Sequence, residues 1–323
     1  MKLVTYESGG QSRVGVIQDN KVLDVRKVIR YLEYGSIPGG LSQRTNFNRA
    51  ARTLVGQDFA PRDMIDLIGR GEAWRKALGV VTAALAKTVD SARVPRGLST
   101  PLARARLLAP IPKPGKITCI GRNYASHALE RGNKPPEQPI YFLKSGNTIC
   151  GPGDPIRLPP NSTQVDYEAE FAVVIGKRGG RIPEEKAYDY VAGYMILHDV
   201  SARDLQSSDG QWFRGKSCDT FAPTGPWIVT RDEIKDPHNL RISFSLNGET
   251  MQDSNTSNMI FKVPYLVSYF SQSATWEVGD LISTGTPAGV GASRKPPVFL
   301  KPGDTASVTI EGLGTLTNPV VGP

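Results

Sequence analysis

The sequence feature that most constrains the fold is an alternating acidic run that leads directly into an apolar run. Asp166, Glu168 and Glu170 alternate with an aromatic and a small residue, and the apolar residues 171–175 follow without a break. In a β-strand, alternate side chains share one face, so the spacing predicts three carboxylates pointing the same way. The apolar continuation predicts that this strand belongs to a core.

Carboxylates grouped at the mouth of a core strand repel one another and lose hydration, which is costly unless a positive charge compensates them. A hard divalent cation would do so, because Mg²⁺, Mn²⁺ and Ca²⁺ prefer carboxylate oxygens. The alternative is an exposed edge strand whose polar face pairs with Lys or Arg. The acidic run therefore predicts either a metal site or a solvated strand face.

A further acid follows the next apolar strand candidate, residues 193–197. Asp199 ends that run and precedes a segment with helical spacing, in which Arg203 and Gln206 share a face. Asp199 can be read as a helix N-cap. Alternatively, an acid at a strand end beside an Arg and a Gln forms a pocket for a carboxylated ligand, since Arg grips a carboxylate with two donors.

A possible acid–base pair lies near the start of the second half of the chain. The spacing after Asn123 is helical, which places His127 and Glu130 on one face. A carboxylate beside an imidazole can orient it and make it a general base. A surface His–Glu pair can equally be a modest contact that stabilises a helix.

The remaining pattern predicts a mixed α/β, strand-rich chain in two domains. Residues 1–92 read as a small α+β domain, with strands around 3–6, 14–17 and 22–25 and a helix around 74–85. Residues 93–116 are rich in Pro and Arg and read as an extended connector. Residues 117–323 read as a rolled or sandwiched β-domain, with strand candidates at 117–120, 171–175, 193–197, 227–230, 242–246 and 306–310.

Charge and cysteine content narrow the class of protein. The chain has 39 Lys plus Arg against 31 Asp plus Glu, a net charge of +8, which favours anionic partners. The basic residues are dispersed and no nucleic-acid-binding motif accompanies them, so we expect a small acidic molecule as partner and no nucleic acid. The three cysteines are far apart, which argues against a disulfide scaffold or a thiolate zinc site. No signal-type or membrane-spanning apolar run occurs, so we expect no membrane partner and a cytoplasmic location.

Taken in order, these motifs resemble the fumarylacetoacetate hydrolase (FAH) family over roughly residues 105–320. The resemblance rests on five stretches beyond the acidic run: Gly121–Glu130, Pro139–Lys144, His198–Gln206, Lys216–Phe221 and Gly279–Gly291. Each stretch is moderately specific, and the ordered set is highly specific. The resemblance implies an FAH-like β-roll catalytic domain and a homodimer.

The resemblance also implies roles for individual residues. Mg²⁺ or Mn²⁺ would bind Glu168, Glu170 and Asp199, and His127 with Glu130 would activate a water. Lys216 would stabilise developing negative charge, and the substrate would be surrounded by four side chains, namely Lys144, Arg203, Gln206 and Thr286. The founding hydrolase has a further metal-binding aspartate where this chain has Asn123, which leaves three protein ligands and open positions on the metal.

The implied reaction is metal-assisted chemistry on a 2-oxo or β-diketo acid. A His–Glu-activated water predicts hydrolysis of a C–C bond in an acylpyruvate- or fumarylpyruvate-like acid. Without that water, the same chemistry serves a decarboxylase or isomerase acting on diene-dioate intermediates of aromatic degradation, and fold and metal site do not separate these outcomes.

Rival classes remain weaker. A non-catalytic metal-binding β-domain stays open as an alternative. A serine hydrolase is disfavoured because no Gly-x-Ser-x-Gly motif occurs. A dinucleotide enzyme is disfavoured because the glycine-rich stretch 285–291 has the wrong spacing and contains Pro.

Overall fold

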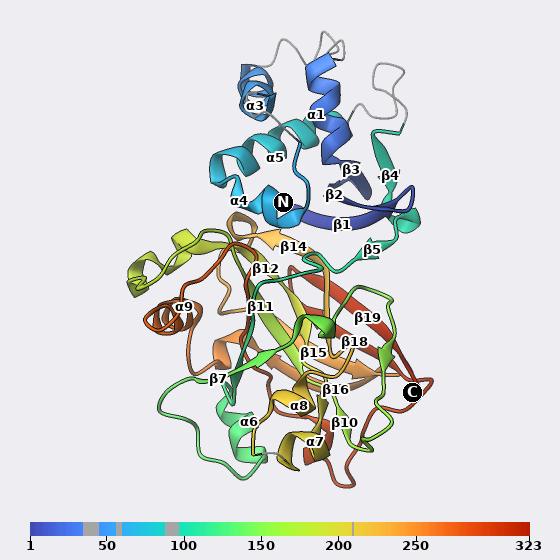
Figure 1. The fold of residues 1–323 in the computed structure, drawn as a ribbon, viewed down its shortest axis with the longest axis vertical. Coiled ribbons are helices and arrows are strands. Elements are labelled where there is room, and N and C mark those ends of the chain that lie inside the picture. Colours follow the sequence, from blue (N-terminus) through green and yellow to red (C-terminus); the bar gives the residue numbers. More distant parts are fainter. Residues whose placement is uncertain (35–44, 56–59, 88–96, 209) are drawn as a thin grey trace. The chain divides into compact units, whose positions relative to one another are not determined.

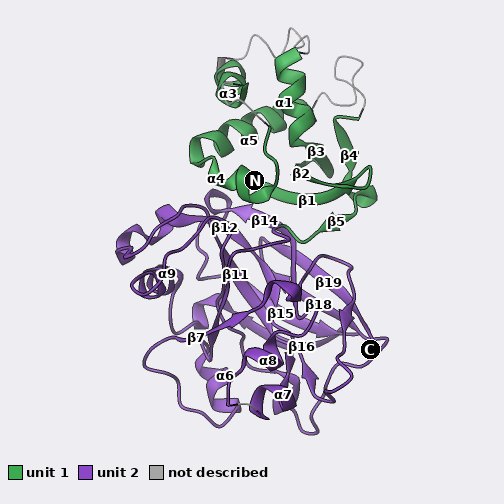
Figure 2. Ribbon diagram, viewed as in Figure 1, with its two compact units in different colours: residues 1–110 green, residues 111–323 purple. Residues whose placement is uncertain are grey.

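The structure is a computed structural model that describes residues 1–34, 45–55, 60–87, 97–208 and 210–323. Figure 1 shows its elements in chain order. The chain divides into two compact units, Met1–Pro110 and Ile111–Pro323, which Figure 2 colours separately. The mixed α/β, strand-rich class predicted from the sequence is confirmed.

The first unit is an antiparallel sheet with helices, in the order β4-β3-β2-β1-β5. Its strands are β1 (Lys2–Ser8), β2 (Gln11–Gln18), β3 (Lys21–Asp24), β4 (Ser99–Pro101) and β5 (Leu107–Leu108). Its helices are α1 (Val25–Tyr34), α3 (Thr45–Val55), α4 (Met64–Gly69) and α5 (Glu72–Ala86). The apolar spacing that predicted a helix around 74–85 is the buried face of α5, where Trp74, Leu78, Val81 and Leu85 are at most 1% exposed.

Part of the predicted connector belongs to this first unit. Within residues 93–116, the first four lie outside the described residues, whereas β4 pairs with β3 and β5 pairs with β1. Pro101 ends the short edge strand β4, a position where a missing N–H costs the ladder nothing. The Pro-rich composition therefore marks sheet edges as well as extended chain.

The second unit contains two sheets that share one core. The first has the order β14-β12-β11-β17-β6-β7, with β8 beside β14, and the second has the order β16-β15-β18-β19-β9. Buried residues of both, such as Phe171 and Tyr194 from one and Ile242 and Val308 from the other, belong to a single apolar cluster. This is the two-layer arrangement expected of a β-rich domain.

The bounds of the second unit's elements follow. The strands of the first sheet are β6 (Ile117–Gly121), β7 (Ile140–Lys144), β8 (Ile149–Cys150), β11 (Ala169–Ile175), β12 (Val191–His198), β14 (Ala222–Thr230) and β17 (Leu281–Ser283). Those of the second sheet are β9 (Ile156–Arg157), β15 (Arg241–Leu246), β16 (Glu249–Asn255), β18 (Thr305–Ile310) and β19 (Gly314–Val321). Two short strands, β10 (Val165–Asp166) and β13 (Ser201–Ala202), pair with each other, and the α-helices are α6 (Ala125–Glu130), α7 (Arg203–Ser208), α8 (Phe213–Lys216) and α9 (Val263–Ser271).

The acidic run differs from the single strand that its alternation predicted. It breaks at Tyr167 and Glu168, between β10 and β11, where the Ala169 N–H donates to the side chain of Gln252 at 2.9 Å. Asp166 is therefore not part of the cluster of carboxylate oxygens that Glu168 and Glu170 form with Asp199. A local alternation cannot predict this break, because its cause is a partner 83 residues away.

The helix expected after Asp199 also begins later than predicted. Ser201 and Ala202 form β13, which pairs with β10, before α7 starts at Arg203.

No helix in the described ranges is both long and apolar enough to cross a membrane.

Candidate metal centre and acid–base pair

Three buried carboxylates meet where β11 and β12 lie side by side. Glu168, Glu170 and Asp199 each offer an oxygen within 4.8 Å of the others, and none is more than 4% exposed. The antiparallel register brings them together, because Ala169 pairs with His198 and the Asp199 N–H donates to the Glu168 carbonyl at 2.9 Å. The solvated edge strand, the alternative reading of the acidic run, is therefore wrong.

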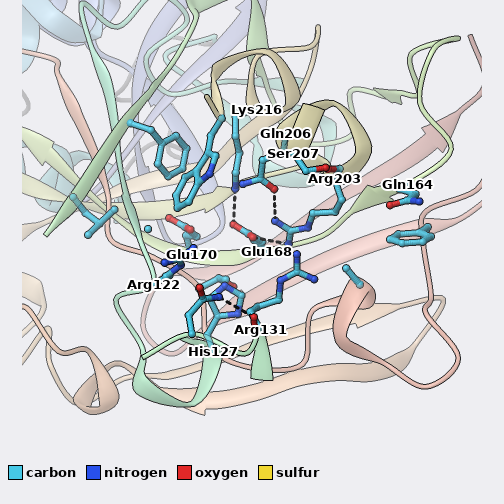
Figure 3. A pocket seen from close by; sticks show the side chains of 18 of the residues that line it. Arg122, His127, Arg131, Gln164, Glu168, Glu170, Arg203, Gln206, Ser207 and Lys216 are labelled. Carbon is cyan, nitrogen blue, oxygen red and sulfur yellow. Dashed lines mark hydrogen bonds and ion pairs between the residues drawn. The ribbon is translucent and has the colours of Figure 1, made fainter. Parts of the chain in front are cut away.

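Cationic side chains surround two of these carboxylates, Glu168 and Asp199; Figure 3 shows Lys216 and Arg203 beside Glu168. The Lys216 ammonium lies 2.8 Å from Glu168 and 2.6 Å from Asp199, and Lys144 lies 2.6 Å from the other Asp199 oxygen. Arg203 donates to Glu168 at 2.6 Å and to Asp166 at 2.8 Å. Burial raises the pKa of Glu168, but the charges of Lys216 and Arg203 lower it by more, so this carboxyl stays ionised.

Glu170 is the carboxylate without a cation. It makes no ion pair in the described part of the chain, and it accepts hydrogen bonds from the Ser283 hydroxyl and, at 3.0 Å, from the Gly285 N–H. Burial, together with the negative charges of Asp199 and Glu168, raises the pKa of Glu170 well above its ordinary value. An unmatched buried carboxylate beside two others is the environment that a divalent cation stabilises.

The donor set therefore fits a hard divalent ion. Three carboxylate oxygens on one side leave further positions for water or a ligand, as oxygen-preferring ions such as Mg²⁺ and Mn²⁺ require. Asn123 lies outside this set, because its amide donates to the carbonyls of Phe261 and Thr284 and its oxygen accepts from the Phe261 N–H.

The predicted acid–base pair is formed. His127 and Glu130 lie one turn apart on α6, with Nδ1 2.7 Å from the Glu130 carboxylate. The second Glu130 oxygen accepts from the Gly289 N–H at 2.8 Å, which ties α6 to the glycine-rich loop. In that loop Gly289 has φ +105° and packs against the Met251 carbonyl, where a side chain would not fit.

A cavity of about 410 Å³ is lined by His127 of the pair and by two of the three carboxylates, while Glu130 and Asp199 do not line it. Of the residues that the sequence suggested, it is lined by His127, Glu168, Glu170, Arg203, Gln206, Lys216 and Thr286. Two are already engaged by the protein, since Gln206 accepts from Arg203 at 3.0 Å and Thr286 accepts from Gln252 at 2.8 Å. Lys144 lies behind Asp199 with a fully buried side chain and does not line the cavity.

Sequence reasoning missed three large side chains of this cavity, Arg122, Arg131 and Trp212. Arg122 has a left-handed backbone, φ +56°, and its guanidinium lies 5.6 Å from the centre of a Trp212 ring. Arg122 belongs to the same motif as Asn123, and Arg131 follows Glu130, so their closeness to a predicted site motif could have pointed to these two residues. Trp212 had none.

The net charge of +8 does not come from the unit that contains this cavity. Residues 1–110 hold 18 Lys plus Arg against 9 Asp plus Glu, whereas residues 111–323 hold 21 against 22. The unit that contains the carboxylates is therefore nearly neutral. Affinity for an acidic ligand has to come from individual cations and a bound metal.

Comparison with known proteins shows the family to which the chain belongs. The family model described as "Fumarylacetoacetate (FAA) hydrolase C-terminal" matches residues 116–321. Oxaloacetate tautomerase Fahd2a, mitochondrial, of Rattus norvegicus is 48% identical over 262 residues, covering 81% of this chain and 80% of that protein. Oxaloacetate tautomerase YisK of Bacillus subtilis is 39% identical over 330 residues, covering 99% of this chain and all of that protein. The structure of fumarylacetoacetate hydrolase from Exiguobacterium antarcticum aligns over 100% of both chains, with 34% identity and a TM-score of 0.77.

Proposed function

The chain belongs to the fumarylacetoacetate hydrolase family, and we propose that within it the protein is a metal-dependent keto–enol tautomerase of a small 2-oxo dicarboxylic acid, with oxaloacetate as the first candidate. The observation that carries this proposal is the 39% identity to oxaloacetate tautomerase YisK along essentially the whole of both chains. The 48% identity to the rat oxaloacetate tautomerase points the same way. The relatives thus favour the isomerase alternative over the C–C hydrolase that the sequence motifs first suggested.

The carboxylates supply the metal site in this proposal. Glu168, Glu170 and Asp199 would hold Mg²⁺ or Mn²⁺, and the ion would polarise the 2-keto oxygen of the substrate as a Lewis acid. Lys216 lines the cavity, and from its position beside Glu168 and Asp199 its charge would stabilise negative charge that develops on that oxygen. Arg203 would keep Glu168 ionised and in place through its 2.6 Å contact.

His127 would carry the proton. Tautomerisation moves a proton from the carbon next to the ketone to the ketone oxygen, so one base that can give the proton back is sufficient. Nδ1 of His127 is held by Glu130, which leaves Nε2 to take the proton from the carbon while the electron pair moves towards the oxygen. The same nitrogen then returns the proton to the oxygen. Glu130 would stabilise the imidazolium between these steps.

Hydrolysis of an acylpyruvate is the second candidate, and the intact His127–Glu130 pair is the observation that favours it. Oriented towards a water, the same imidazole would be a hydrolytic base. A homodimer and a cytoplasmic location also remain predictions; the rat relative carries the word mitochondrial in its name.

One set of assays separates the candidate reactions. The purified protein with Mn²⁺ or Mg²⁺ is given oxaloacetate, and loss of the enol is followed by ultraviolet absorbance while pyruvate and CO₂ are measured separately. An acylpyruvate is tested in parallel. We expect enol–keto conversion above the spontaneous rate, little CO₂ and little acylpyruvate cleavage. Cleavage of the acylpyruvate without faster tautomerisation would replace this proposal with the hydrolase.

A matched pair of variants tests the base. His127→Gln should remove the catalysed tautomerisation and leave Mn²⁺ binding intact. His238→Gln is the control, because His238 is half-buried, accepts from the Val263 N–H at 3.1 Å and does not line the cavity. Full turnover in His127→Gln would eliminate the proposed proton carrier.

A further inference from the structure

The cavity holds more positive charge than the protein itself uses. Arg122, Arg131, Arg203 and Lys216 all line it. Arg203 is already paired within the protein: its three nitrogens donate to Asp166, Glu168 and Gln206, and its side chain is 7% exposed. The Lys216 ammonium likewise forms ion pairs with Glu168 and Asp199. The carboxylate clamp that the sequence suggested for Arg203 therefore conflicts with the contacts that this side chain already makes.

Arg131 is in the opposite situation. Its backbone N–H closes α6 on the His127 carbonyl, but its guanidinium has no hydrogen bond or ion pair in the described part of the chain. Partial burial and the nearby positive charge of Arg203 lower the pKa of Arg131, while Asp166 and Glu168 act in the other direction. Figure 3 draws the Arg131 side chain among the cavity residues, close to Arg203 and Glu168.

A cation at a helix C-terminus can be a simple partner of the helix dipole. That explanation accounts for the position of Arg131 in the sequence but not for the direction of its side chain. Arg131 is an exposed residue, so hydration does not decide its direction, but turned outward the guanidinium would avoid the charge of Arg203. Lining the cavity instead, it faces a like charge at a cost that an anion would remove.

We propose that Arg131 binds the second carboxylate of a dicarboxylate substrate whose 2-oxo acid end lies at Glu168, Glu170 and Asp199. The inference rests on the proposed function for the position of that 2-oxo end. A guanidinium with free donors binds a carboxylate through two parallel hydrogen bonds. The cavity of about 410 Å³ is in the size range of small-molecule sites.

This assignment also explains how the substrate meets its base. His127 lies in α6, Arg131 is the C-cap residue of the same helix, and both line the cavity. In a four-carbon 2-oxo dicarboxylate, the carbon that loses its proton lies between the ketone and the second carboxylate. With the ketone at the acidic cluster and that carboxylate on Arg131, the intervening carbon is directed towards His127. Arg131 is thus a specificity residue that also positions the substrate.

Binding measurements test the assignment without relying on turnover. Malate and lactate both present a 2-hydroxy acid to the metal, but only malate has the second carboxylate, and oxalate can bind the metal alone. Calorimetry on the Mn²⁺-loaded protein should show malate bound more tightly than lactate. Arg131→Met should weaken malate about 10- to 100-fold, the worth of a charged hydrogen-bond pair, and leave lactate and oxalate unchanged. Arg131→Lys should recover part of the loss.

Lys134→Met is the matched control, because Lys134 is an exposed cation three residues further on and does not line the cavity. It should leave the binding of all three probes unchanged. Equal affinities of the unsubstituted protein for malate and lactate, or an Arg131→Met variant that binds malate normally or loses oxalate as well, would overturn the assignment. A protein that shows the malate preference but does not tautomerise oxaloacetate would refute the proposed function and leave Arg131 as the carboxylate site.

Discussion

Lys144 offers a sharp test of the charge arrangement around the carboxylates. Its ammonium lies 2.6 Å from Asp199 and 3.1 Å from the Val200 carbonyl, and its side chain is fully buried. Lys144→Met keeps much of the length and removes the cation. We predict that this change destabilises the metal-free protein and, at the same time, tightens Mn²⁺ binding.

The magnitudes follow from a thermodynamic cycle. Removing one partner of a buried ion pair costs about 3–5 kcal/mol. Lys216 still contacts one Asp199 oxygen in this variant, but the oxygen that faced Lys144 is left without a cation. With Mn²⁺ bound, the ion replaces the positive charge that Lys144 supplied to Asp199, so the cost falls to about 1 kcal/mol for the lost Val200 hydrogen bond. The difference of about 2–4 kcal/mol must appear as metal affinity, about 30- to 1,000-fold tighter binding. In the absence of metal, the melting temperature should fall by about 6–20 °C.

The assay pairs calorimetric titration with Mn²⁺ and thermal unfolding in a chelator. Lys116→Met is the matched control, because Lys116 lies 2.6 Å from buried Asp280 but is not part of the cluster. It should lower stability and leave Mn²⁺ affinity unchanged. An unchanged or weaker Mn²⁺ affinity in Lys144→Met would refute the reasoning, since it would mean that Lys144 and the metal do not compete for the same negative charge.

Three further predictions address the ligands, the acid–base pair and acid stability. Asp199→Asn should abolish Mn²⁺ binding in calorimetry and all turnover; retained affinity would remove Asp199 from the ligand set. Glu130→Gln should lower kcat about 100-fold while Mn²⁺ affinity is kept, and Glu137→Gln, an exposed change in the same segment, should not. Burial, reinforced by the charge of Lys144, lowers the pKa of His198 from 6.5 to about 3. As pH falls below 6.5, the unfolded chain therefore binds a proton at this imidazole before the folded protein does. The stability that the neutral imidazole contributes is present above pH 6.5 and is lost as pH falls towards 3. His198→Phe should therefore lose less stability between pH 7 and pH 4 in urea unfolding; equal losses would contradict this.

Features set by neighbouring residues could be predicted from the sequence. The Asp19–Asn20 turn is formed with φ 47° and 58°, and Asn247–Gly248 with φ 53° and 86°, because such dipeptides tolerate left-handed backbone. His127 and Glu130 meet because helical spacing alone places them on one face. Two of the cluster acids, Glu168 and Glu170, were likewise predictable from the acidic run, since few arrangements tolerate such acids at the end of a core strand, whereas Asp199 was added to them by the family resemblance.

Features set by distant partners could not be predicted. Asp166 was grouped with Glu168 by alternation, yet it accepts from the N–H groups of Gly291 and Ala292, 125 and 126 residues away. Lys144 was expected beside the substrate but is held behind Asp199. The sequence names the charged groups, whereas the folded register decides which of them neutralise one another.

That distinction identifies which groups are left for a ligand. Four acids, Asp166, Glu168, Glu170 and Asp199, and three bases, Lys144, Arg203 and Lys216, are buried together. Every one of the three bases contacts an acid of the group, and Glu170 alone has no cationic partner, so the cluster retains a place for a metal ion and no unpaired cation that could bind a substrate carboxylate. An anionic substrate must then find its positive charge in the bound metal and in a cation outside the group. Arg131, which lines the same cavity and has no partner in the described chain, supplies that cation, and this is why the second carboxylate, rather than the first, should depend on it.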